Sequence, residues 1–154
     1  MSGFQPHDNR GFFMLPQAPQ DAGYYVYGKP GKGRAQYADP RMLSLIFAVE
    51  REWRLTETRR FGIGNMSQAN GVKYDHASHM KGVEVDVRPV RKDGAEDNCF
   101  HTWAQYDKEG TQKLIEIWFR CFPGRLTIYF NDNRIPGVRP LGGHSNHFHV
   151  QFDA

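Results

Sequence analysis

Residues 142–152 read GGHSNHFHVQF, and their last six positions alternate between polar and apolar side chains. The apolar positions are Phe148, Val150 and Phe152. The polar positions between them are His147, His149 and Gln151. A period of two is typical of a β-strand that packs one face on a core and carries polar groups on the other. We therefore expect a strand over residues 147–152 that presents imidazoles on its polar face.

Other stretches alternate in the same way. Residues 83–88 read VEVDVR, with valine at each odd position and Glu84 and Asp86 on the opposite face. Residues 125–131 read RLTIYFN and also alternate, and residues 24–27, YYVY, have the composition of a short strand. We expect all of these stretches to be strands of one sheet.

Two segments have the apolar periodicity of helices. The first begins at Asp39, a good capping residue, and continues with Pro40, which fits the first helical position. Its expected apolar stripe consists of Leu43, Ile46, Phe47, Val49 and Trp53. The second helix is expected from about Thr111 to Phe122, where Pro123 ends it.

These elements predict an α+β fold, in which a small, mainly antiparallel sheet has two principal helices against one face and long loops at the other. The 154 residues amount to a single domain, residues 1–154. Residues 1–23 are rich in Gly, Pro and Gln and show no period, so we expect an irregular N-terminal arm.

Composition excludes several classes of protein. With 39% hydrophobic and 24% charged residues, the chain is neither disordered nor a coiled coil. It has no apolar run of the roughly 18–20 residues that a membrane-spanning helix needs, so no membrane insertion is expected. The net charge of +3 is small and its charges are interleaved, which speaks against nucleic acid as a partner.

Five of the seven histidines fall into two groups. His76 and His79 form the first, and His144, His147 and His149 form the second. If the strands that carry Asp86 and His149 are neighbours, both side chains enter one cleft, and His79 can fold back over the same face. An isolated HxH motif is usually only a polar strand edge, but the two groups together predict a shared metal site. Two imidazoles and a carboxylate form a three-ligand set of the catalytic zinc type, with an open position for water. The same donors also suit other divalent ions.

Three segments carry a family resemblance. They are residues 64–94 (GNMSQANGVKYDHASHMKGVEVDVRPVRKDG), residues 130–140 (FNDNRIPGVRP) and residues 142–152 (GGHSNHFHVQF). In this order and spacing they resemble the penicillin-insensitive murein endopeptidases. That family lies within the lysostaphin, D-Ala-D-Ala carboxypeptidase and Sonic hedgehog-like zinc metallopeptidases. The resemblance spans residues 61–152, which we expect to form the zinc-site core of a hedgehog/D-Ala-D-Ala-peptidase-like fold.

The resemblance implies one Zn²⁺ per chain, with His79, Asp86 and His149 as its ligands. It also implies that His147 is the catalytic histidine and that His144 is a further active-site histidine. The positions expected to bind substrate or to support the ligands are His76, Ser78, Glu84, Asn131 and Asp132.

The sequence departs from the family pattern at two positions near the expected site. Glu84 stands where the family commonly has aspartate, which leaves its detailed role open. Asn146 stands where the carboxypeptidase branch has a glutamate base. The second departure argues for a histidine-assisted mechanism.

The activity implied by the resemblance is hydrolysis of peptide cross-links in bacterial peptidoglycan, between D-Ala and meso-diaminopimelate or between two diaminopimelates. The first 30 residues lack the pattern of a secretory signal. We therefore expect synthesis in the cytoplasm and action in the periplasm or on the cell wall, as an antibacterial effector of a contractile (type VI) secretion system or as a phage lysis protein. A trimmed form of a periplasmic enzyme is the remaining alternative. Effector delivery implies an immunity protein or a component of the secretion apparatus as a partner.

Two other functions compete with the hydrolase. One is a non-catalytic zinc-binding domain of the same fold that recognises a wall peptide or a protein partner. The other is a metal-dependent nuclease, since GHSNHFH is similar to His-Asn-His sites, but such enzymes need a basic channel for phosphates. Cys99 and Cys121 are compatible either with a disulfide or with two thiols.

Overall fold

The main sheet forms from the stretches in which polar and apolar residues alternate. In the computed structural model, which describes residues 5–73 and 78–154, five strands lie in the order β2-β4-β5-β7-β6. Their bounds are β2 Tyr24–Val26, β4 Phe61–Ile63, β5 Glu84–Val87, β6 Leu126–Tyr129 and β7 Phe148–Phe152. The β2–β4 pair is parallel and the other pairs are antiparallel. The expected mainly antiparallel sheet is confirmed, with each expected strand slightly shorter than its alternating stretch.

Both expected helices are present, with caps that explain where they begin. Helix α1, Pro40–Arg54, follows Asp39, whose carboxylate accepts a hydrogen bond from the Arg41 backbone NH. Helix α2, Lys108–Cys121, begins three residues before the expected Thr111, because the Asp107 carboxylate accepts from the Gly110 NH. A single 3₁₀ turn, η1, covers Ala69–Gly71.

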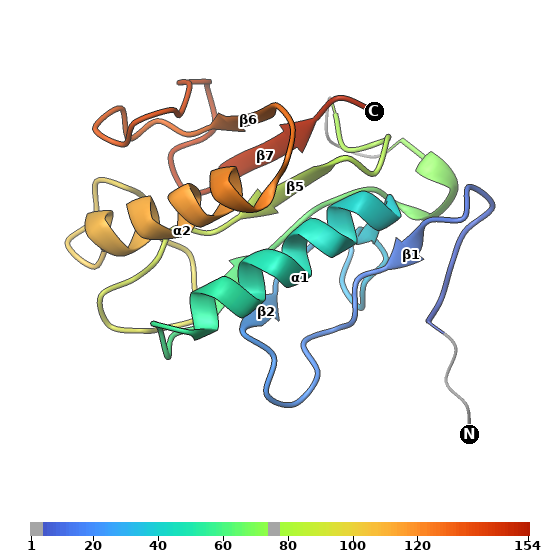
Figure 1. Cartoon of the computed structure of the whole chain (residues 1–154), viewed down its shortest axis with the longest axis horizontal. Coiled ribbons are helices and arrows are strands. Elements are labelled where there is room, and N and C mark those ends of the chain that lie inside the picture. Colours follow the sequence, from blue (N-terminus) through green and yellow to red (C-terminus); the bar gives the residue numbers. More distant parts are fainter. Residues whose placement is uncertain (1–4, 74–77) are drawn as a thin grey trace.

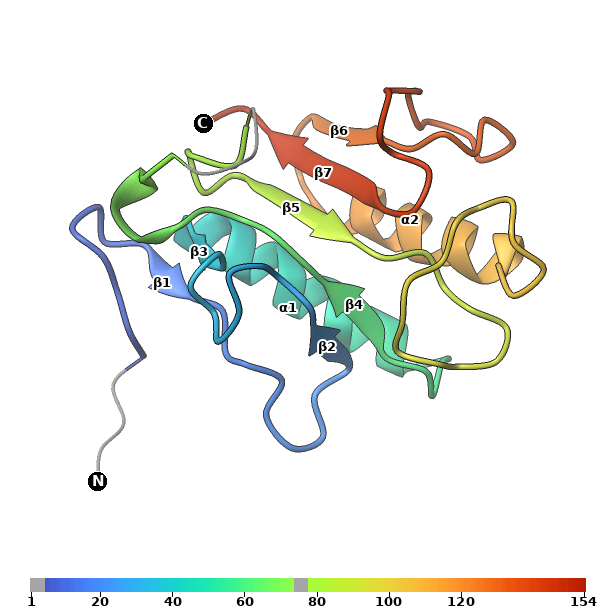
Figure 2. The ribbon, with the colours of Figure 1, turned by 180° about the vertical axis from the view of Figure 1, so that it is seen from behind.

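The helices cover one face of the sheet (Figure 1), and most loops run around its ends and edges, so that the strands lie in front in the view from behind (Figure 2). The alternating apolar residues of β5 and β7 point toward the helices and are almost completely buried. Trp53 of α1 and Trp118 of α2 are fully buried in the same hydrophobic core. The polar residues of the same strands therefore face away from the helices.

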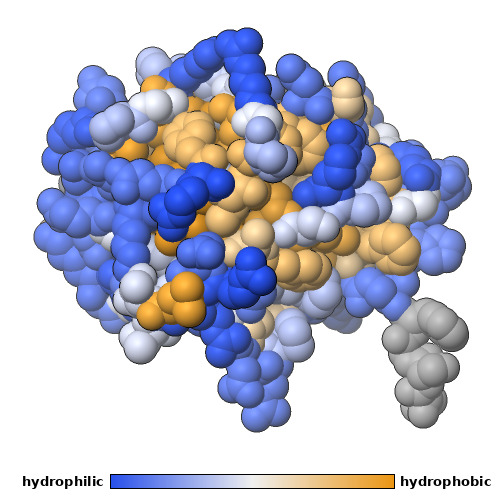
Figure 3. Space-filling view, viewed as in Figure 1, coloured by the Kyte–Doolittle hydropathy of each residue, from blue (hydrophilic) through white to orange (hydrophobic). Residues whose placement is uncertain are grey.

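The prediction of the buried α1 stripe was wrong at one residue, Phe47. Phe47 is 40% exposed, whereas Met42 and Leu45 are buried. Residues 42, 45, 46, 49 and 53 follow the helical spacing, and Phe47 lies about 100° from Ile46 around the axis, toward solvent. On this side of the molecule, apolar side chains lie exposed among charged ones (Figure 3).

Three strands within the described residues were not predicted from the sequence. β4 reads FGI, and the glycine between its two apolar residues hides the alternation. β1, Phe13–Met14, and β3, Tyr37–Ala38, form a separate two-stranded sheet. The arm over residues 1–23 is thus irregular only in part, and its described residues are held by pairing and by Leu15, which is fully buried.

The two cysteines and the helices bear on the expectations drawn from composition. Cys99 and Cys121 are both free thiols, so the disulfide alternative is not realised. Within residues 5–73 and 78–154, each helix is too short or too polar to cross a membrane.

Candidate metal centre

The register between β5 and β7 brings two of the expected ligands together. Asp86 pairs directly with His149 across the antiparallel ladder, so both side chains project from the same face of the sheet. His149 Nδ1 lies 3.1 Å from Asp86 Oδ1. The sequence-based condition that these two strands be neighbours is confirmed.

His79 reaches the same point from the loop that precedes β5. Its backbone φ is 67°, and Gly82 has φ 71°, so the chain turns back through two left-handed residues. His79 Nε2 lies 3.3 Å from Asp86 Oδ1. The His79 and His149 rings are 4.8 Å apart and nearly perpendicular. The Glu84 carboxylate accepts a hydrogen bond from the His79 backbone NH, which fixes this end of the loop.

His79, Asp86 and His149 form a buried group that could hold a metal ion. One ligand atom from each lies within 4.8 Å of the others, and the three residues are only 3%, 7% and 4% exposed. Ligand atoms around tetrahedral zinc lie roughly 3.4 Å apart. Both contacts to Asp86 are already close to that separation, and a small ring movement would bring the two imidazoles to it. Two imidazoles with one carboxylate fit a catalytic zinc site, although the same donors do not identify the metal.

Charges in this group stabilise one another despite their burial. Burial would raise the pKa of Asp86, but hydrogen bonds from His149 and His79 outweigh it and hold that pKa below its usual range. Burial lowers the pKa of His149, yet the carboxylates of Asp86 and Glu84 raise it overall to about 9. The pKa of Glu84 is lowered, because the two imidazoles outweigh the effect of its burial.

His147 lies at the edge of the three ligands. Its Nε2 is 3.8 Å from Asp86 Oδ1, and its side chain is about a quarter exposed. Burial lowers the pKa of His147, and the neighbouring imidazoles add to that effect against the opposing influence of Asp86.

Hydrogen bonds define which ring nitrogen of His147 carries the proton. Asn146 Nδ2 donates to Asn98 Oδ1 at 3.1 Å, so Asn146 Oδ1 faces His147 Nδ1 at 3.0 Å. An amide oxygen only accepts, and therefore Nδ1 of His147 is the donor. In the neutral ring, this leaves a lone pair on Nε2, on the side of Asp86.

His144 also lies in this group, as expected. Its ring centroid is 4.7 Å from that of His147 and 5.8 Å from that of His149. Asn131 holds the loop that carries His144. Its backbone NH donates to His144 O, and its side chain bonds both the Leu141 NH and the Ser145 hydroxyl.

The other expected residues support a loop, line a neighbouring cavity or lie outside the described residues. The Asp132 carboxylate is 2% exposed and accepts hydrogen bonds from Tyr106 and Arg134, so it stabilises the loop after β6. Ser78 and Glu84 line a cavity of about 270 Å³ beside the group. His76 falls within residues 74–77, outside the described residues.

Sequence reasoning missed two neighbours of the ligands. Gln151 Oε1 lies 3.0 Å from His149 Nε2, and its position on the polar face of β7 was the available signal. Tyr27 lies in line with Asp86 and His149 across the strands of the sheet. Gly64 stands between Tyr27 and Asp86, and its backbone NH donates to the backbone O of Asp86. A Cβ on Gly64 would lie 2.6 Å from the Tyr27 ring, so glycine is what lets the phenol cross the strand. Nothing in the sequence links these residues before β2 and β4 are paired.

Comparisons with known proteins find no family model and no curated protein that matches this chain. The chemistry of the centre is therefore argued from its own residues.

Proposed function

We propose that the protein is a zinc-dependent endopeptidase that hydrolyses the peptide cross-links of bacterial peptidoglycan. The observation that carries the proposal is the buried His79–Asp86–His149 group with His147 at its edge. A resident metal would sit against the polar face of the sheet, between two strands and a loop. This arrangement supports a hedgehog/D-Ala-D-Ala-peptidase-like fold, as the resemblance of residues 61–152 implies.

His79, Asp86 and His149 are the residues that would hold Zn²⁺. When bound, the ion would supply Lewis-acid chemistry, making hydroxide available at neutral pH and polarising a carbonyl group. Burial of the three side chains excludes competing water and fixes their orientation.

His147 would transfer the proton. Its Nδ1 donates to Asn146, so the lone pair on Nε2 can accept the proton that the attacking water loses. Hydrolysis breaks the C–N bond of the cross-link, and His147 would return this proton to the leaving amine. His144, beside His147, would add a hydrogen bond to the developing oxyanion.

The substrate class rests on the resemblance, namely the order and spacing of the two histidine motifs. D-Ala–meso-diaminopimelate is the proposed bond, with the diaminopimelate–diaminopimelate bond as the variant. This substrate places the action of the enzyme in the periplasm or on the wall, after delivery by a secretion system or in phage lysis. An immunity protein or a component of the secretion apparatus would then be the protein partner.

The test is digestion of purified peptidoglycan sacculi, followed by mass spectrometry of the soluble fragments. The samples are wild type, wild type with chelator, His79→Ala and, as a matched control, His7→Ala, whose imidazole is exposed and far from the ligands in the chain. Cross-linked dimers are expected to fall to monomers only with wild type and His7→Ala, and the fragment masses identify the bond. Equal digestion by His79→Ala would refute a role for the metal group.

A His147→Ala variant separates the hydrolase from a non-catalytic zinc-binding domain of the same fold. We expect it to keep one zinc ion per chain while turnover falls 10²–10⁴-fold, roughly what general acid–base catalysis contributes. A wild type that binds zinc but leaves every dimer intact would favour the binding domain.

A further inference from the structure

The N-terminal arm lies against the loop that carries His79. Arg10 makes the principal contacts across this junction. Its guanidinium donates to Met80 O at 2.7 Å, to Gln68 O at 2.9 Å and to the Ser67 hydroxyl at 2.9 Å. One side chain therefore bridges both ends of the loop between β4 and β5, including the residue directly after His79.

Asp8 holds Arg10 in this position. Its carboxylate is fully buried and accepts from Arg10 Nη2 at 2.6 Å and Nε at 2.9 Å. The same carboxylate accepts from the Asn70 NH at 2.8 Å, which fixes η1 to the arm. A buried carboxylate held by a two-point guanidinium pair and backbone NH groups is rigid, because losing either partner leaves a buried charge unpaired.

Phe12 adds an apolar contact two residues farther along the same loop. A Cβ on Gly82 would lie 2.6 Å from the Phe12 ring, so the ring packs directly on this left-handed glycine. The Arg10 guanidinium carbon lies 4.4 Å from the centre of the same ring. The arm thus contacts the chain one residue and three residues after His79.

We propose that Asp8, Arg10 and Phe12 form a clamp that positions His79 for the metal. His79 has a positive φ and belongs to a loop rather than to the sheet, so its place depends on contacts from outside β5 and β7 as well as on the hydrogen bond from its backbone NH to Glu84. The inference rests on the metal centre of the proposed function and is independent of the reaction catalysed there. It assigns a positioning role to the N-terminal arm, which supplies none of the proposed metal ligands.

The first test measures Zn²⁺ affinity of the purified full chain by competition with a chromophoric chelator. Arg10→Ala is expected to weaken Zn²⁺ binding by about 10–100-fold, as loss of the groups that orient a ligand does. Arg10→Lys should weaken it less, since an ammonium keeps the charge but lacks the fork of donors. This second variant also serves if Arg10→Ala fails to fold.

Arg41→Ala is the matched control. Arg41 follows Asp39 by two residues, as Arg10 follows Asp8, and its Nε and Nη2 also donate to the neighbouring carboxylate, here to Oδ1 and Oδ2 of Asp39. Its hydrogen bonds remain local, and we expect unchanged Zn²⁺ affinity. An equal loss in Arg10→Ala and Arg41→Ala would overturn the clamp.

A double mutant tests whether the effect acts through His79. In a His79→Ala background the clamped ligand is gone, so Arg10→Ala should cause little further loss of the residual Zn²⁺ affinity. The same fold loss in both backgrounds would indicate general destabilisation and contradict the proposal.

Amide hydrogen exchange in chelator-treated protein makes the clamp testable without metal. Arg10→Ala should speed exchange at residues 78–84 and leave residues 148–152 unchanged. If this holds while the wild type binds no Zn²⁺, the clamp stands and the proposed metal centre fails. Unchanged exchange at residues 78–84 together with unchanged affinity would overturn the clamp.

Discussion

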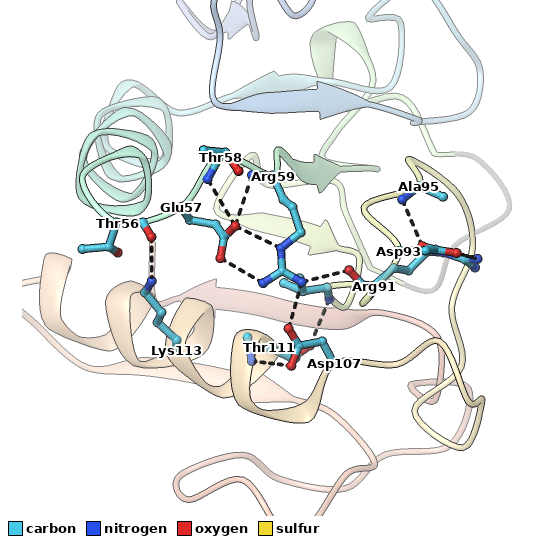
Figure 4. Close-up of polar contacts among 12 residues, drawn as sticks. Thr56, Glu57, Thr58, Arg59, Arg91, Asp93, Ala95, Asp107, Thr111 and Lys113 are labelled. Atoms are coloured by element: carbon cyan, nitrogen blue, oxygen red, sulfur yellow. Dashed lines mark hydrogen bonds and ion pairs between the residues drawn. The ribbon is translucent and has the colours of Figure 1, made fainter.

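Two clusters of charged side chains in this protein are built in opposite ways. In the first, Arg59 lies between the carboxylates of Glu57 and Asp107 (Figure 4). Its guanidinium donates to Glu57 Oε2 at 2.9 Å, to Asp107 Oδ2 at 2.8 Å and to the Arg91 carbonyl at 2.9 Å. The chain supplies both the cation and its acceptors, so the charges of this cluster are paired within the protein.

The candidate metal centre has the reverse arrangement. Ring nitrogens of His79, His147 and His149 lie 3.3, 3.8 and 3.1 Å from one oxygen, Asp86 Oδ1. A carboxylate oxygen cannot make good hydrogen bonds to three imidazoles at these distances at once. Converging donor atoms of this kind are typical of a ligand site, whereas Arg59 and its partners are typical of a structural ion pair. The difference separates residues that we expect to affect metal binding from residues that we expect to affect stability.

The largest expected effect is that of Asp86→Asn. The amide keeps the shape of the carboxylate but loses its charge, so the variant should lose bound zinc and sacculus hydrolysis together. Zinc content after dialysis and the fragment assay measure both. Glu57→Gln, the same kind of change in the Arg59 cluster, is the control and should keep both properties. One zinc ion per chain in Asp86→Asn would contradict the assignment of this ligand.

Zinc itself should stabilise the fold. At a free Zn²⁺ concentration 100 times the dissociation constant, binding to the native state alone adds about 2.7 kcal/mol to the free energy of unfolding. Urea denaturation with Zn²⁺ and with chelator measures this difference. Glu57→Gln should show the same gain and Asp86→Asn none. A gain of equal size in Asp86→Asn would place the stabilising ion elsewhere.

Arg59→Met should change stability and leave the metal centre intact. Removing the guanidinium leaves two largely buried carboxylates without their partner, which we expect to cost about 2 kcal/mol. Urea denaturation measures the loss, and chelator competition should find unchanged Zn²⁺ affinity. Arg120→Met is the control, because its contact with Glu52 is 3.8 Å long and exposed, and should cost under about 0.5 kcal/mol. A weaker zinc affinity in Arg59→Met would show that the two clusters are coupled.

A further expected effect is the acid dependence of the Arg59 cluster. Arg59 lowers the pKa of Glu57 from 4.5 to about 2, against the opposing effect of burial. Between these values the unfolded chain binds more protons than the folded one, so stability falls as the pH falls. The contribution is complete above about pH 4.5 and disappears near pH 2. Urea denaturation across this range should give a shallower slope for Glu57→Gln, and an unchanged slope would argue against this carboxylate.

Much of the fold was predictable because the core is patterned locally. Alternation in residues 83–88 and 147–152 predicted two strands and the faces on which Asp86 and His149 lie, since the side-chain period of a strand is two. Asp39 and Pro40 predicted the start of α1 for an equally local reason. β4 was not predictable in this way, because Gly62 and Gly64 replace the residues that would alternate.

Contacts between residues far apart in the chain could not be predicted from such local patterns. Arg59 and Asp107 are 48 residues apart, and Arg10 and Met80 are 70 apart. No local period records such pairs, and many charged residues in the chain compete for each partner. Only the packing of the arm, the loops and the helix decides which of them meet.

The sequence by itself determined the chemistry of the candidate centre: Asp86 and His149 on polar faces of strands, the imidazole of His79 in the loop before Asp86, and two further histidines close to His149 in the chain. Tertiary structure decided how these groups combine, because the β5–β7 register places Asp86 opposite His149 and the turn at Gly82 brings in His79. Side-chain type is a property of one residue, whereas a distance of 3 Å between residues in separate elements depends on the whole fold.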